Sequence, residues 1–558
     1  MSIDAVPVHG EGLDDPSTYD VTADADATAH ALMDELLLHP WGQVSPSVYE
    51  TGRLVRLAPW LAGHEQRVRF LLATQRPDGG WGGPGGYALV PTLSATEALL
   101  TLLRHPGDDP IADTSRASVA GAAGRGLDML IGFLGSADAQ DIPDMPALDL
   151  IASSLIRSIN QLLSDSAASR PAPLAPRWRD TRLHPPAWLD GARLAAVRAA
   201  IASGADLPSK VFHALETAGE KASRASIARL PSTGGVGASP AATAAWLDER
   251  TASDPRHPAR VFLETVVENH AGLAPCGIPI TTFERAWVLR SLARAGLAPD
   301  IPSALVRSLE ASAHAGMAAA EGLPADADTT SVALYALALV GAPCAPDALW
   351  SYETDTHFCT WKGEQGFSTT VNAHVLEAFG QYLEMVEAGS AGHTKSAPRY
   401  RATRDKLVAL LCDHQEADGR WLDRWHASPY YATACCALAL ARFGGEHATP
   451  ALRRARRWVV DTQRPDGSWG IWAGTAEESA YALQILAQTR PGPAEDSESI
   501  ARGHRFLLRA AGDLRDQEFD GPALWHDKDL YLPSAIVRAE ILGTLRTLQR
   551  HHLGTKVC

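Results

Sequence analysis

The chain has 558 residues, of which 65 are acidic and 50 are basic, so its formal net charge is −15. A chain of this length forms about two to four domains, and 46% hydrophobic with 21% charged residues is typical of a globular protein. The acidic excess argues against a nucleic-acid partner, because binding to a phosphate backbone requires an excess of basic residues.

The N-terminal residues and the cysteines exclude further classes. Residues 1–20 are acidic and contain no apolar core, so they do not form a signal peptide. Apolar runs such as 332–344 are shorter than the roughly 20 residues that span a bilayer, so we expect a cytoplasmic protein without an integral membrane segment. The seven cysteines form no CxxC pair, so neither a zinc cluster nor a disulfide framework is indicated.

A short pattern of Gln, Asp-Gly and Trp occurs three times, at residues 75–81, 415–421 and 463–469. Each copy follows a predicted helix, and its Asp-Gly pair is typical of a turn. The last two copies are 48 residues apart, a spacing typical of repeats built from helix pairs. We interpret the three motifs as loop staples that hold a helical fold together, with no part in chemistry.

The N-terminal half predicts a smaller helical barrel over roughly residues 50–270. A helix beginning near Ser94 follows the first Gln/Trp motif, and a second apolar helix follows Ser239. A break with two prolines at 253–258 then precedes the C-terminal half.

In the C-terminal half, six apolar helices each open with a small or hydroxyl residue or an acid. They are apolar over most of their circumference, as expected for a buried ring, and more polar helices lie between them. Almost no segment alternates with a period of two, so the predicted class is all-α with an (α/α)6 barrel. The six openings lie at Thr281, Asp328, Thr370, Tyr431, Thr475 and Pro533.

Asp326 and Asp328 stand immediately before the second of these buried helices. Acidic residues at a helix start are ordinary caps, and this interpretation stays open from the residues alone. The placement also favours chemistry, because this helix would open into the interior of the barrel. Burial raises a carboxyl pKa, so one of the two Asp side chains can stay protonated and act as an acid toward a bound alkene.

Eight aromatic residues of the C-terminal half are candidates for the wall of that interior. Aromatic faces stabilise cations by roughly 0.5–2 kcal/mol each without acting as nucleophiles. Plain core packing is the alternative for any single ring, whereas the set favours a pocket shaped for a cation. The candidates are Trp421, Trp425, Tyr430, Tyr431, Trp472, Tyr481, Trp525 and Tyr531.

Taken together, these motifs resemble the class II, protonation-initiated terpene cyclases, and in particular the bacterial diterpene-type cyclases. The stretch from Asp326 to Thr330 is similar to the DxDD signature of that family, and Gln/Trp repeats mark its wider fold. The resemblance extends from about Val44 to Leu542. Further stretches carry it: 45–51, 207–216, 237–244 and 524–531.

The resemblance implies two (α/α) helical barrels in a βγ arrangement. An N-terminal segment of the β domain would cover residues 1–45, the γ domain 46–272 and the main part of the β domain 273–558. The substrate would be a linear prenyl diphosphate held between the two barrels. Geranylgeranyl diphosphate is favoured on family grounds and farnesyl diphosphate is second.

The resemblance also implies roles around the acid motif. Asp328 would be the general acid, and Asp326 would orient it or share its proton. Asn372 matches a family Asn that hydrogen-bonds the acid, although a helix cap is the alternative. Thr329 departs from the signature, because it stands where the family has a fourth-position Asp, and its hydroxyl can donate to Asp328.

For the diphosphate, Lys210 matches a family lysine, and Lys528 is a second candidate. An ordinary surface lysine explains Lys210 equally well and Lys528 better. Mg2+ would bind diphosphate oxygens with few protein ligands, and Asp138 and Asp141 lie where the family carries an acidic patch. A solvated loop explains that patch as well.

The predicted product keeps its diphosphate, because no DDxxD metal motif and no third domain are present. We therefore predict a cyclase that protonates the terminal alkene and closes a bicyclic decalin cation. A downstream class I synthase or phosphatase would use the product. The candidates for the terminating base are His213, His374, His426 and several tyrosines.

Three other functions remain as alternatives. A squalene–hopene-type hydrocarbon cyclase would carry more Gln/Trp repeats. A non-catalytic helical toroid that binds a partner would use Asp326 and Asp328 only as caps. A protein prenyltransferase subunit is the least favoured, because no set of ligands indicates a zinc site.

Overall fold

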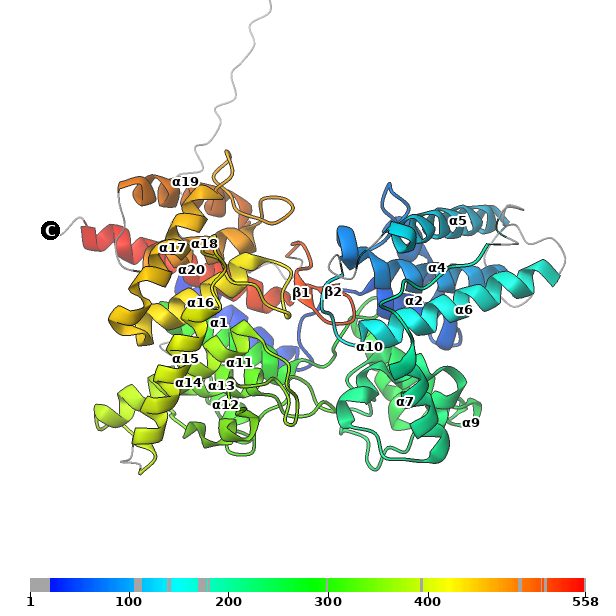
Figure 1. Cartoon of the computed structure of the whole chain (residues 1–558), viewed down its shortest axis with the longest axis horizontal. Coiled ribbons are helices and arrows are strands. Elements are labelled where there is room, and N and C mark those ends of the chain that lie inside the picture. Colours follow the sequence, from blue (N-terminus) through cyan, green and yellow to red (C-terminus); the bar gives the residue numbers. More distant parts are fainter. Residues whose placement is uncertain are drawn as a thin grey trace, which may run out of the picture.

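The computed structural model describes residues 21–104, 113–136, 138, 142–168, 178, 181–297, 300–391, 395–489, 494–512, 514–515 and 519–555. These residues form two helical lobes that lie side by side (Figure 1). The larger lobe contains α1 and the elements from α11 to α20, whereas the elements from α2 to α9 form the smaller lobe. The all-α class with two barrels is thus confirmed.

The elements of the larger lobe are α1 (Val21–Leu38), α11 (Thr281–Ala295), α12 (Ser303–Glu310), α13 (Ala327–Leu339), η6 (Pro346–Tyr352), α14 (Thr369–Glu387), α15 (Ala397–Asp413), α16 (Pro429–Phe443), η7 (Gly445–Ala448), α17 (Thr449–Asp461), α18 (Ala476–Gln488), α19 (Ala494–Ala510), β1 (Trp525–His526), β2 (Leu530–Tyr531) and α20 (Ser534–Thr555). The elements that lie between α1 and α11 in the chain are α2 (Val48–Leu57), α3 (His64–Ala73), η2 (Gly85–Ala88), α4 (Leu89–Arg104), α5 (Asp113–Ser136), α6 (Leu148–Ala168), α7 (Ala192–Ser203), η5 (Ser209–Arg224), α8 (Pro240–Trp246), α9 (Glu249–Ser253) and α10 (Pro258–Asn269).

A closed ring of six inner helices forms the larger lobe. In ring order these are α11, α13, α14, α16, α18 and α20, each packed on the next, and α20 packs on α11. All six begin at or within two residues of the openings expected from the sequence. Four of them are capped by a side chain that accepts a hydrogen bond from the first turn, which satisfies backbone N–H groups that have no partner within the helix. The capping residues are Asp326, Ser368, Ser428 and Thr475.

The outer layer alternates with this ring along the chain. The helices α12, α15, α17 and α19 and the short helix η6 each connect two inner helices. The last gap, between α20 and α11, is filled by α1, which packs on both. Its buried face, including Ala29, Leu32 and Leu36, is part of the larger lobe's core. The helix α1 therefore completes the outer layer of the larger barrel.

The smaller lobe is built around a shorter ring of α2, α4, α6, η5 and α8, in which α8 packs back on α2. The helix α10 lies in the range assigned to the smaller domain, yet its Phe262, Leu263 and Val266 belong to the larger lobe's core. Because α10 also packs on α8 of the smaller lobe, it joins the two lobes, and the domain boundary near residue 272 stays a prediction.

Two segments of the smaller lobe, Gly85–Arg104 and Arg116–Ser136, are long and apolar enough to cross a membrane by length and composition alone. From the sequence alone, we expect every apolar run to be too short to span a bilayer. The apolar window of the first segment is 89% buried inside the protein, because α4 is an inner helix. The window of the second is 50% buried, in keeping with its position on the outside of α4. Core helices of globular proteins can have the same length and apolar composition, so these segments are weak evidence for a membrane span.

The Gln/Trp motifs connect consecutive outer helices, as the interpretation of loop staples requires. In the third motif, Trp469 Nε1–H donates to the Val459 carbonyl of α17 at 2.7 Å. Gln463 Nε2–H donates to the Ser499 carbonyl of α19 at 2.9 Å. The second motif repeats both bonds between α15 and α17, through Trp421 and Gln415.

We expect Trp469→Phe to lower the free energy of unfolding by about 1–3 kcal/mol, because the buried Val459 carbonyl loses its indole donor at 2.7 Å and keeps only the Thr462 hydroxyl at 3.4 Å. Urea unfolding followed by circular dichroism measures the change. The matched control is Trp60→Phe, the same substitution at a ring that is 41% exposed. Equal losses from both variants would contradict the staple.

Candidate active site

A cavity of about 540 Å³ lies at the junction of the two lobes. Asp328, at the start of α13, lines it from the larger lobe, together with Trp525 and Tyr531 of the β1–β2 hairpin. The smaller lobe contributes His213 of η5 and the loop before α6. The acid motif therefore faces a space that both barrels enclose.

Asp328 is hydrogen-bonded to a histidine of the neighbouring inner helix α14. The distance between Asp328 Oδ1 and His374 Nδ1 is 2.7 Å. Burial, and after it the nearby charge of Arg290, lower the pKa of His374 to about 3, so the imidazole is neutral at pH 7. His374 was considered only as a base, whereas the structure makes it the direct partner of the acid.

The tautomer of His374 follows from its other nitrogen. His374 Nε2 is buried and has no hydrogen-bond partner among the residues that the structure describes. A buried N–H without an acceptor is rarer than a buried acceptor without a donor, so we assign the proton to Nδ1, which donates to Asp328 Oδ1. The acidic proton of Asp328 is then carried by Oδ2.

The acid itself is protonated at neutral pH. Burial raises the pKa of Asp328 to about 8, and the negative charge of Asp423 adds to this effect. Arg290 opposes the shift only in part, because its guanidinium is occupied by a buried bidentate ion pair with Glu377 at 2.9 Å. Asp328 thus combines a stored proton with contact to the cavity.

Asp326 is the N-terminal cap of α13 as well as a lining residue of the cavity. Its carboxylate accepts from the backbone N–H groups of Thr329 at 2.6 Å and Ala319 at 3.2 Å. The Thr329 hydroxyl donates to it at 3.0 Å, and so not to Asp328 as expected from the sequence. Burial raises the pKa of Asp326 to about 7, although these donors oppose the shift. In the described part of the chain, Asp326 makes no hydrogen bond to Asp328.

Asn372 uses its side-chain amide for other hydrogen bonds than the expected one to Asp328. Asn372 Oδ1 accepts from Phe358 N–H at 2.9 Å, and its amide nitrogen donates to the Phe358 and Ser368 carbonyls. These three bonds use the amide to fix the loop before α14. His374, two residues further along the helix, is the side chain that reaches Asp328.

The structure divides the eight predicted aromatic residues into two groups. Trp425, Tyr431, Trp525 and Tyr531 line the cavity. The other four do not: Trp421 staples α15, Tyr430 packs on Trp458, Tyr481 lies behind Tyr431, and Trp472 contacts Tyr87 of the smaller lobe. The sequence analysis missed Phe283, Trp361 and Trp188, which also line the cavity.

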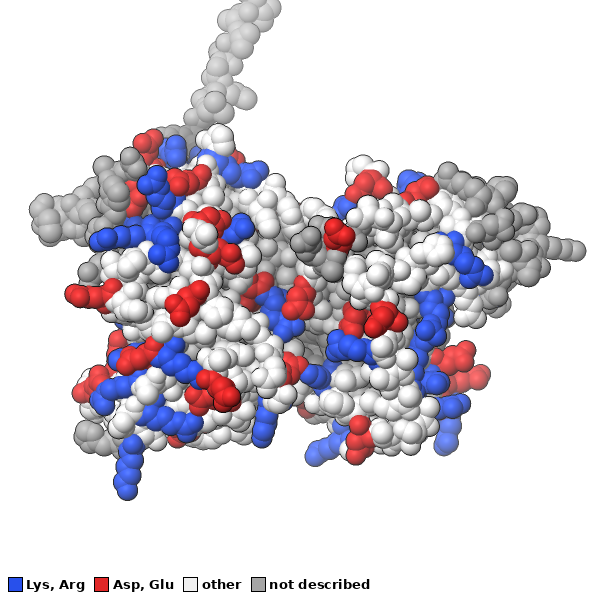
Figure 2. Space-filling view, in the orientation of Figure 1, with Lys and Arg blue, Asp and Glu red and all other residues white. Residues whose placement is uncertain are grey.

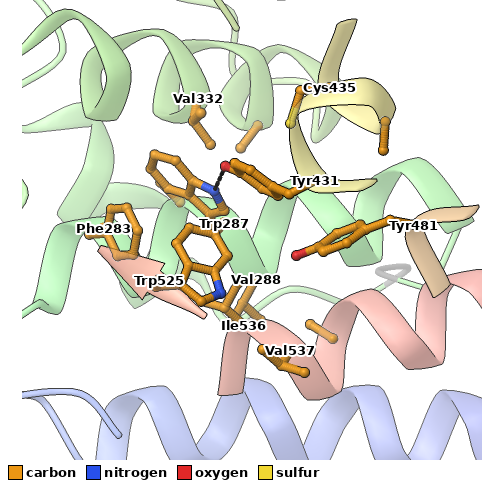
Figure 3. Packing of buried hydrophobic residues seen from close by; sticks show 14 of the residues in the cluster. Phe283, Trp287, Val288, Val332, Tyr431, Cys435, Tyr481, Trp525, Ile536 and Val537 are labelled. Carbon is orange, nitrogen blue, oxygen red and sulfur yellow. Dashed lines mark hydrogen bonds between the residues drawn. The ribbon is translucent and has the colours of Figure 1, made fainter. Parts of the chain in front are cut away.

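Two tryptophan rings of the inner aromatic cluster are held at their polar edges, and Figure 3 shows one of these bonds, between Trp287 and Tyr431. Trp287 Nε1–H donates to the Tyr431 hydroxyl at 3.3 Å, and Trp525 Nε1–H donates to Glu477 at 2.9 Å. Phe283 packs on Trp525 edge to face at 5.7 Å between ring centroids. Rings fixed in this way present their carbon surfaces to the cavity, where a cation can be stabilised.

The two predicted diphosphate ligands have different surroundings. Lys210 lines the cavity, keeps 40% of its side chain exposed, and forms an ion pair with Glu364 across the lobe junction. Lys528 is fully buried and does not line the cavity, so its assignment is wrong. Its ammonium contacts Glu50 at 2.5 Å and Glu216 at 3.0 Å, and its donors are consumed inside the junction.

Further charged residues line the cavity in opposite pairs. Arg193 pairs with Asp149 at 3.0 Å, and Arg424 pairs with Asp144 at 3.1 Å across the lobe junction. The face seen in Figure 2 likewise carries acidic and basic side chains intermixed, including at the waist between the lobes.

No metal site accompanies these residues within the part of the chain that the structure describes. It contains no group of three or more His, Cys, Asp or Glu residues that could hold an ion. Asp138 is exposed and does not line the cavity, and Asp141 lies outside the described residues. The candidate bases also differ in position, because His213 lines the cavity whereas His374 and His426 do not.

Comparison with known proteins agrees with this site. Residues 368–531 match the squalene-hopene cyclase C-terminal domain family. The ent-copalyl diphosphate synthase of Streptomyces sp. (strain KO-3988) is 42% identical over 94% of this chain and 96% of that protein. The labda-7,13-dienyl diphosphate synthase of Streptomyces clavuligerus is 41% identical over 92% of this chain and 91% of that protein. The structure of ent-copalyl diphosphate synthase from Streptomyces platensis is 43% identical, with a TM-score of 0.85 over 94% of this chain and 99% of that chain.

The raised pKa of Asp328 predicts a pH-dependent stability difference. Between the ordinary value of 3.8 and about 8, the unfolded chain has lost a proton that the folded protein keeps, so unfolding becomes easier as the pH rises. Asp328→Asn removes this effect, because an amide does not titrate in this range. We therefore expect the melting temperature of the variant, relative to wild type, to increase from pH 5 to pH 9.

Differential scanning fluorimetry at both pH values measures this difference. Asp206→Asn is the control, since Asp206 is exposed. A difference in melting temperature that is the same at pH 5 and pH 9 would show that Asp328 has no raised pKa.

Proposed function

The chain belongs to the class II terpene cyclases, and we propose that it converts geranylgeranyl diphosphate to a bicyclic, decalin-type diphosphate. Farnesyl diphosphate is the second candidate substrate. The names of the relatives that match more than nine-tenths of this chain support a diterpene substrate. The observation that carries the proposal is a protonated carboxyl, Asp328, at the wall of an aromatic cavity between two lobes.

The first step is proton transfer from Asp328 Oδ2 to the terminal alkene. The alkene electrons form the new C–H bond, and the resulting cation is attacked in turn by two further double bonds, which closes two rings. His374 holds Oδ1 at 2.7 Å and so fixes the direction of the proton on Oδ2. Tyr431 and Trp525 line the cavity and stabilise the travelling positive charge. Loss of a proton from the final cation then gives a neutral bicycle.

The diphosphate is anchored at the lobe junction and keeps its bond to carbon. Lys210, Arg193 and Arg424 line the cavity, and each can exchange its carboxylate partner for a phosphate oxygen. Trp188 and Trp425 also line the cavity, and their buried indole N–H groups have no hydrogen-bond partner among the described residues. These donors match the acceptor oxygens of a diphosphate.

Mg2+ enters this proposal only with the substrate. The carboxylates Asp144, Asp149 and Glu364 at the cavity wall are paired with cations, and no ligand set for a metal was found in the described ranges. We therefore assign no step of the reaction to a metal. Because the product retains its diphosphate, the enzyme that uses it must either ionise that group, as a class I synthase does, or hydrolyse it.

Product analysis tests the proposed reaction. Purified protein is incubated separately with geranylgeranyl and farnesyl diphosphates, and the products are dephosphorylated and analysed by gas chromatography with mass spectrometry. We expect a bicyclic alcohol from the first substrate. Asp328→Asn should lower its formation by about 100-fold or more, because the amide has no acidic proton to deliver.

The rate should also fall as the pH rises through about 8, where Asp328 loses its proton. Thr356→Val, at an exposed residue that does not line the cavity, serves as the control for expression and purification of the variants. Only linear alcohol from both substrates would sink the proposed activity and favour a binding role for the two barrels.

The anchoring role of Lys210 predicts a separate kinetic effect. We expect Lys210→Ala to raise KM for the prenyl diphosphate by about 10-fold, since a charge-assisted bond to phosphate contributes about 1.5–3 kcal/mol. Lys221→Ala is the matched control, because Lys221 lies on the same helix η5, is exposed and does not line the cavity. Steady-state kinetics with both variants decides the matter, and an unchanged KM for Lys210→Ala would remove this residue from the anchor.

A further inference from the structure

A buried carboxylate, Glu477, lies behind the aromatic wall of the cavity and has no part in proton transfer or in anchoring the diphosphate. It is the second residue of α18, its side chain is 2% exposed, and it does not line the cavity. Its Oε1 accepts from Trp525 Nε1–H at 2.9 Å and from the Tyr481 hydroxyl at 3.1 Å. His426 Nε2 lies 3.2 Å from the same oxygen. Glu477 thus gathers three ring systems around one atom.

The tautomer of His426 follows from its other nitrogen. The backbone N–H of Ser428 lies 3.0 Å from His426 Nδ1 and can only donate, so Nδ1 carries a lone pair. Nε2 then carries the proton of a neutral ring and donates it to Glu477 Oε1. The imidazole therefore brings a hydrogen bond to the carboxylate but no positive charge.

The hydrogen bonds of Glu477 fix it as an ionised carboxylate. Three donors point at Oε1, so that oxygen does not carry a proton as well. A proton on Oε2 would be a buried donor without an acceptor, because Oε2 is buried and has no partner among the described residues. The positive end of the helix α18 adds to the stability of the charge, since Glu477 lies in its first turn.

No positive side chain balances this charge. Within the described ranges, neither a lysine nor an arginine forms an ion pair with Glu477, and its neighbour His426 is neutral. Other buried acids of the larger barrel are different, because Arg290 forms ion pairs with Glu377 at 2.9 Å and with Glu540 at 3.7 Å. Buried charges are normally paired, so the missing partner of Glu477 needs an explanation.

The rings bound to Glu477 connect its charge to the cavity. Trp525 lines the cavity itself. His426 stacks on Tyr431, a second ring of the cavity wall, with 4.6 Å between ring centroids. Trp525, Tyr431 and Tyr481 belong to one cluster of neighbouring rings (Figure 3). Trp525 therefore has the carboxylate at its N–H edge and contributes its remaining surface to the space that holds the substrate.

The acid lies in the same part of the cavity. Burial raises the pKa of the Tyr431 phenol, and charge on the nearby Cys435 or Asp328 would add to this rise. The first cation forms on the carbon next to the one that receives the proton of Asp328. Positive charge therefore appears beside the rings that Glu477 holds.

We propose that Glu477 is a positioning residue that acts through Trp525, and that its negative charge is the counter-charge of the carbocations formed in the cyclisation. This inference rests on the function proposed above. The hydrocarbon chain of the bound substrate is neutral, so Glu477 attracts it little. Once Asp328 has given up its proton, the chain carries a positive charge, and the carboxylate lowers the energy of that charge across a ring of low polarity. Such an interaction lowers the barrier without tightening substrate binding.

The position behind a ring suits this role. A carboxylate in contact with a carbocation would bond to it or remove a proton from it, and either event would end the cyclisation early. The indole of Trp525 prevents that contact and still transmits the field. Its N–H donates to an anion, which increases the electron density of the ring and strengthens its attraction for a cation.

Two substitutions at residue 477 separate charge from hydrogen bonding. Glu477→Gln keeps an acceptor at Oε1 and removes the charge, whereas Glu477→Asp keeps the charge and shortens the reach to Trp525. We expect Glu477→Gln to lower kcat for the bicyclic product by about 10-fold or more, with KM within about 2-fold of wild type. We expect Glu477→Asp to retain more of kcat than Glu477→Gln does.

Glu478→Gln is the matched control, because Glu478 is the next residue of α18, is buried and does not line the cavity. Its carboxylate accepts from the hydroxyls of Ser428 and Thr475 and from the backbone N–H of Ile471, and so from no ring of the cavity wall. We expect its kcat to stay within about 2-fold of wild type even if its melting temperature falls.

A pair of inhibitors measures the same interaction without turnover. The charged probe is a prenyl diphosphate that lacks the terminal double bond and has a tertiary ammonium nitrogen in place of the carbon of the first cation. The neutral probe has carbon at that position. By isothermal titration calorimetry, we expect wild-type protein to bind the charged probe about 10-fold or more tightly than the neutral one. Glu477→Gln should lose most of this preference, whereas Glu477→Asp and Glu478→Gln should keep it.

Equal binding of the two probes by wild-type protein would overturn the proposal. So would a loss of kcat in Glu477→Asp at least as large as that in Glu477→Gln, because hydrogen bonding alone would then explain the residue. If Glu477→Gln does not fold, the probes decide with Glu477→Asp, and loss of the preference for the charged probe in this variant rejects the assignment. Failure of wild-type protein to form any bicyclic product would instead reject the proposed function.

Discussion

The buried ammonium of Lys528 is the interaction on which the geometry of the site depends. It lies in the loop between β1 and β2 and binds Glu50 of α2 and Glu216 of η5, which belong to the smaller lobe. The same hairpin supplies Trp525, Asp527 and Tyr531 to the cavity. Removing one partner of a buried ion pair typically costs about 3–5 kcal/mol, because the other charge is left uncompensated. The hairpin, and with it one wall of the cavity, is therefore fixed relative to both barrels.

Within this frame, two carboxyl groups of the same cavity are held in opposite protonation states. Asp328 is bound by a neutral imidazole, whose N–H offsets the cost of burying a carboxylate charge less than a positive charge would. Asp527 is bound by an imidazolium and stays ionised in spite of its burial. Both partners are histidines, and what distinguishes them is whether the second ring nitrogen meets an acceptor. The Gly237 carbonyl provides one for His213, whereas His374 Nε2 has none. The contact made by the second ring nitrogen of each histidine thus decides the protonation state of the carboxyl group that it binds.

The barrel and the position of Asp328 at the start of a buried helix could be predicted from the sequence because their signals are local. Apolar helices that open with a small or hydroxyl residue near Thr370, Tyr431 and Thr475 predict an inner ring. The identity of the acid's partner could not be predicted in this way. Asn372 and His374 are two residues apart and so point to opposite sides of α14, and only the loop at Phe358 decides which side faces Asp328.

The surroundings of residues at tertiary contacts could not be predicted from the sequence either. Lys528 carries no local sign that it is buried rather than exposed, and Trp421 differs from Trp425 only in that its N–H reaches the end of α15.

The position of α1 in the larger barrel has a consequence for how the chain folds. This helix precedes the smaller lobe, yet its apolar face is covered by α11 and α20, and Arg538 of α20 closes a buried ion pair with Glu35 at 2.7 Å. During synthesis, at roughly 5–20 residues per second, α1 emerges about 500 residues before α20, the later of the two helices that cover it. Its Leu32 and Leu36 therefore stay without their final partners until the barrel's last segment leaves the ribosome. The smaller lobe can complete its ring much earlier, so the larger lobe is the part of the molecule that depends on protection from aggregation while it is being made.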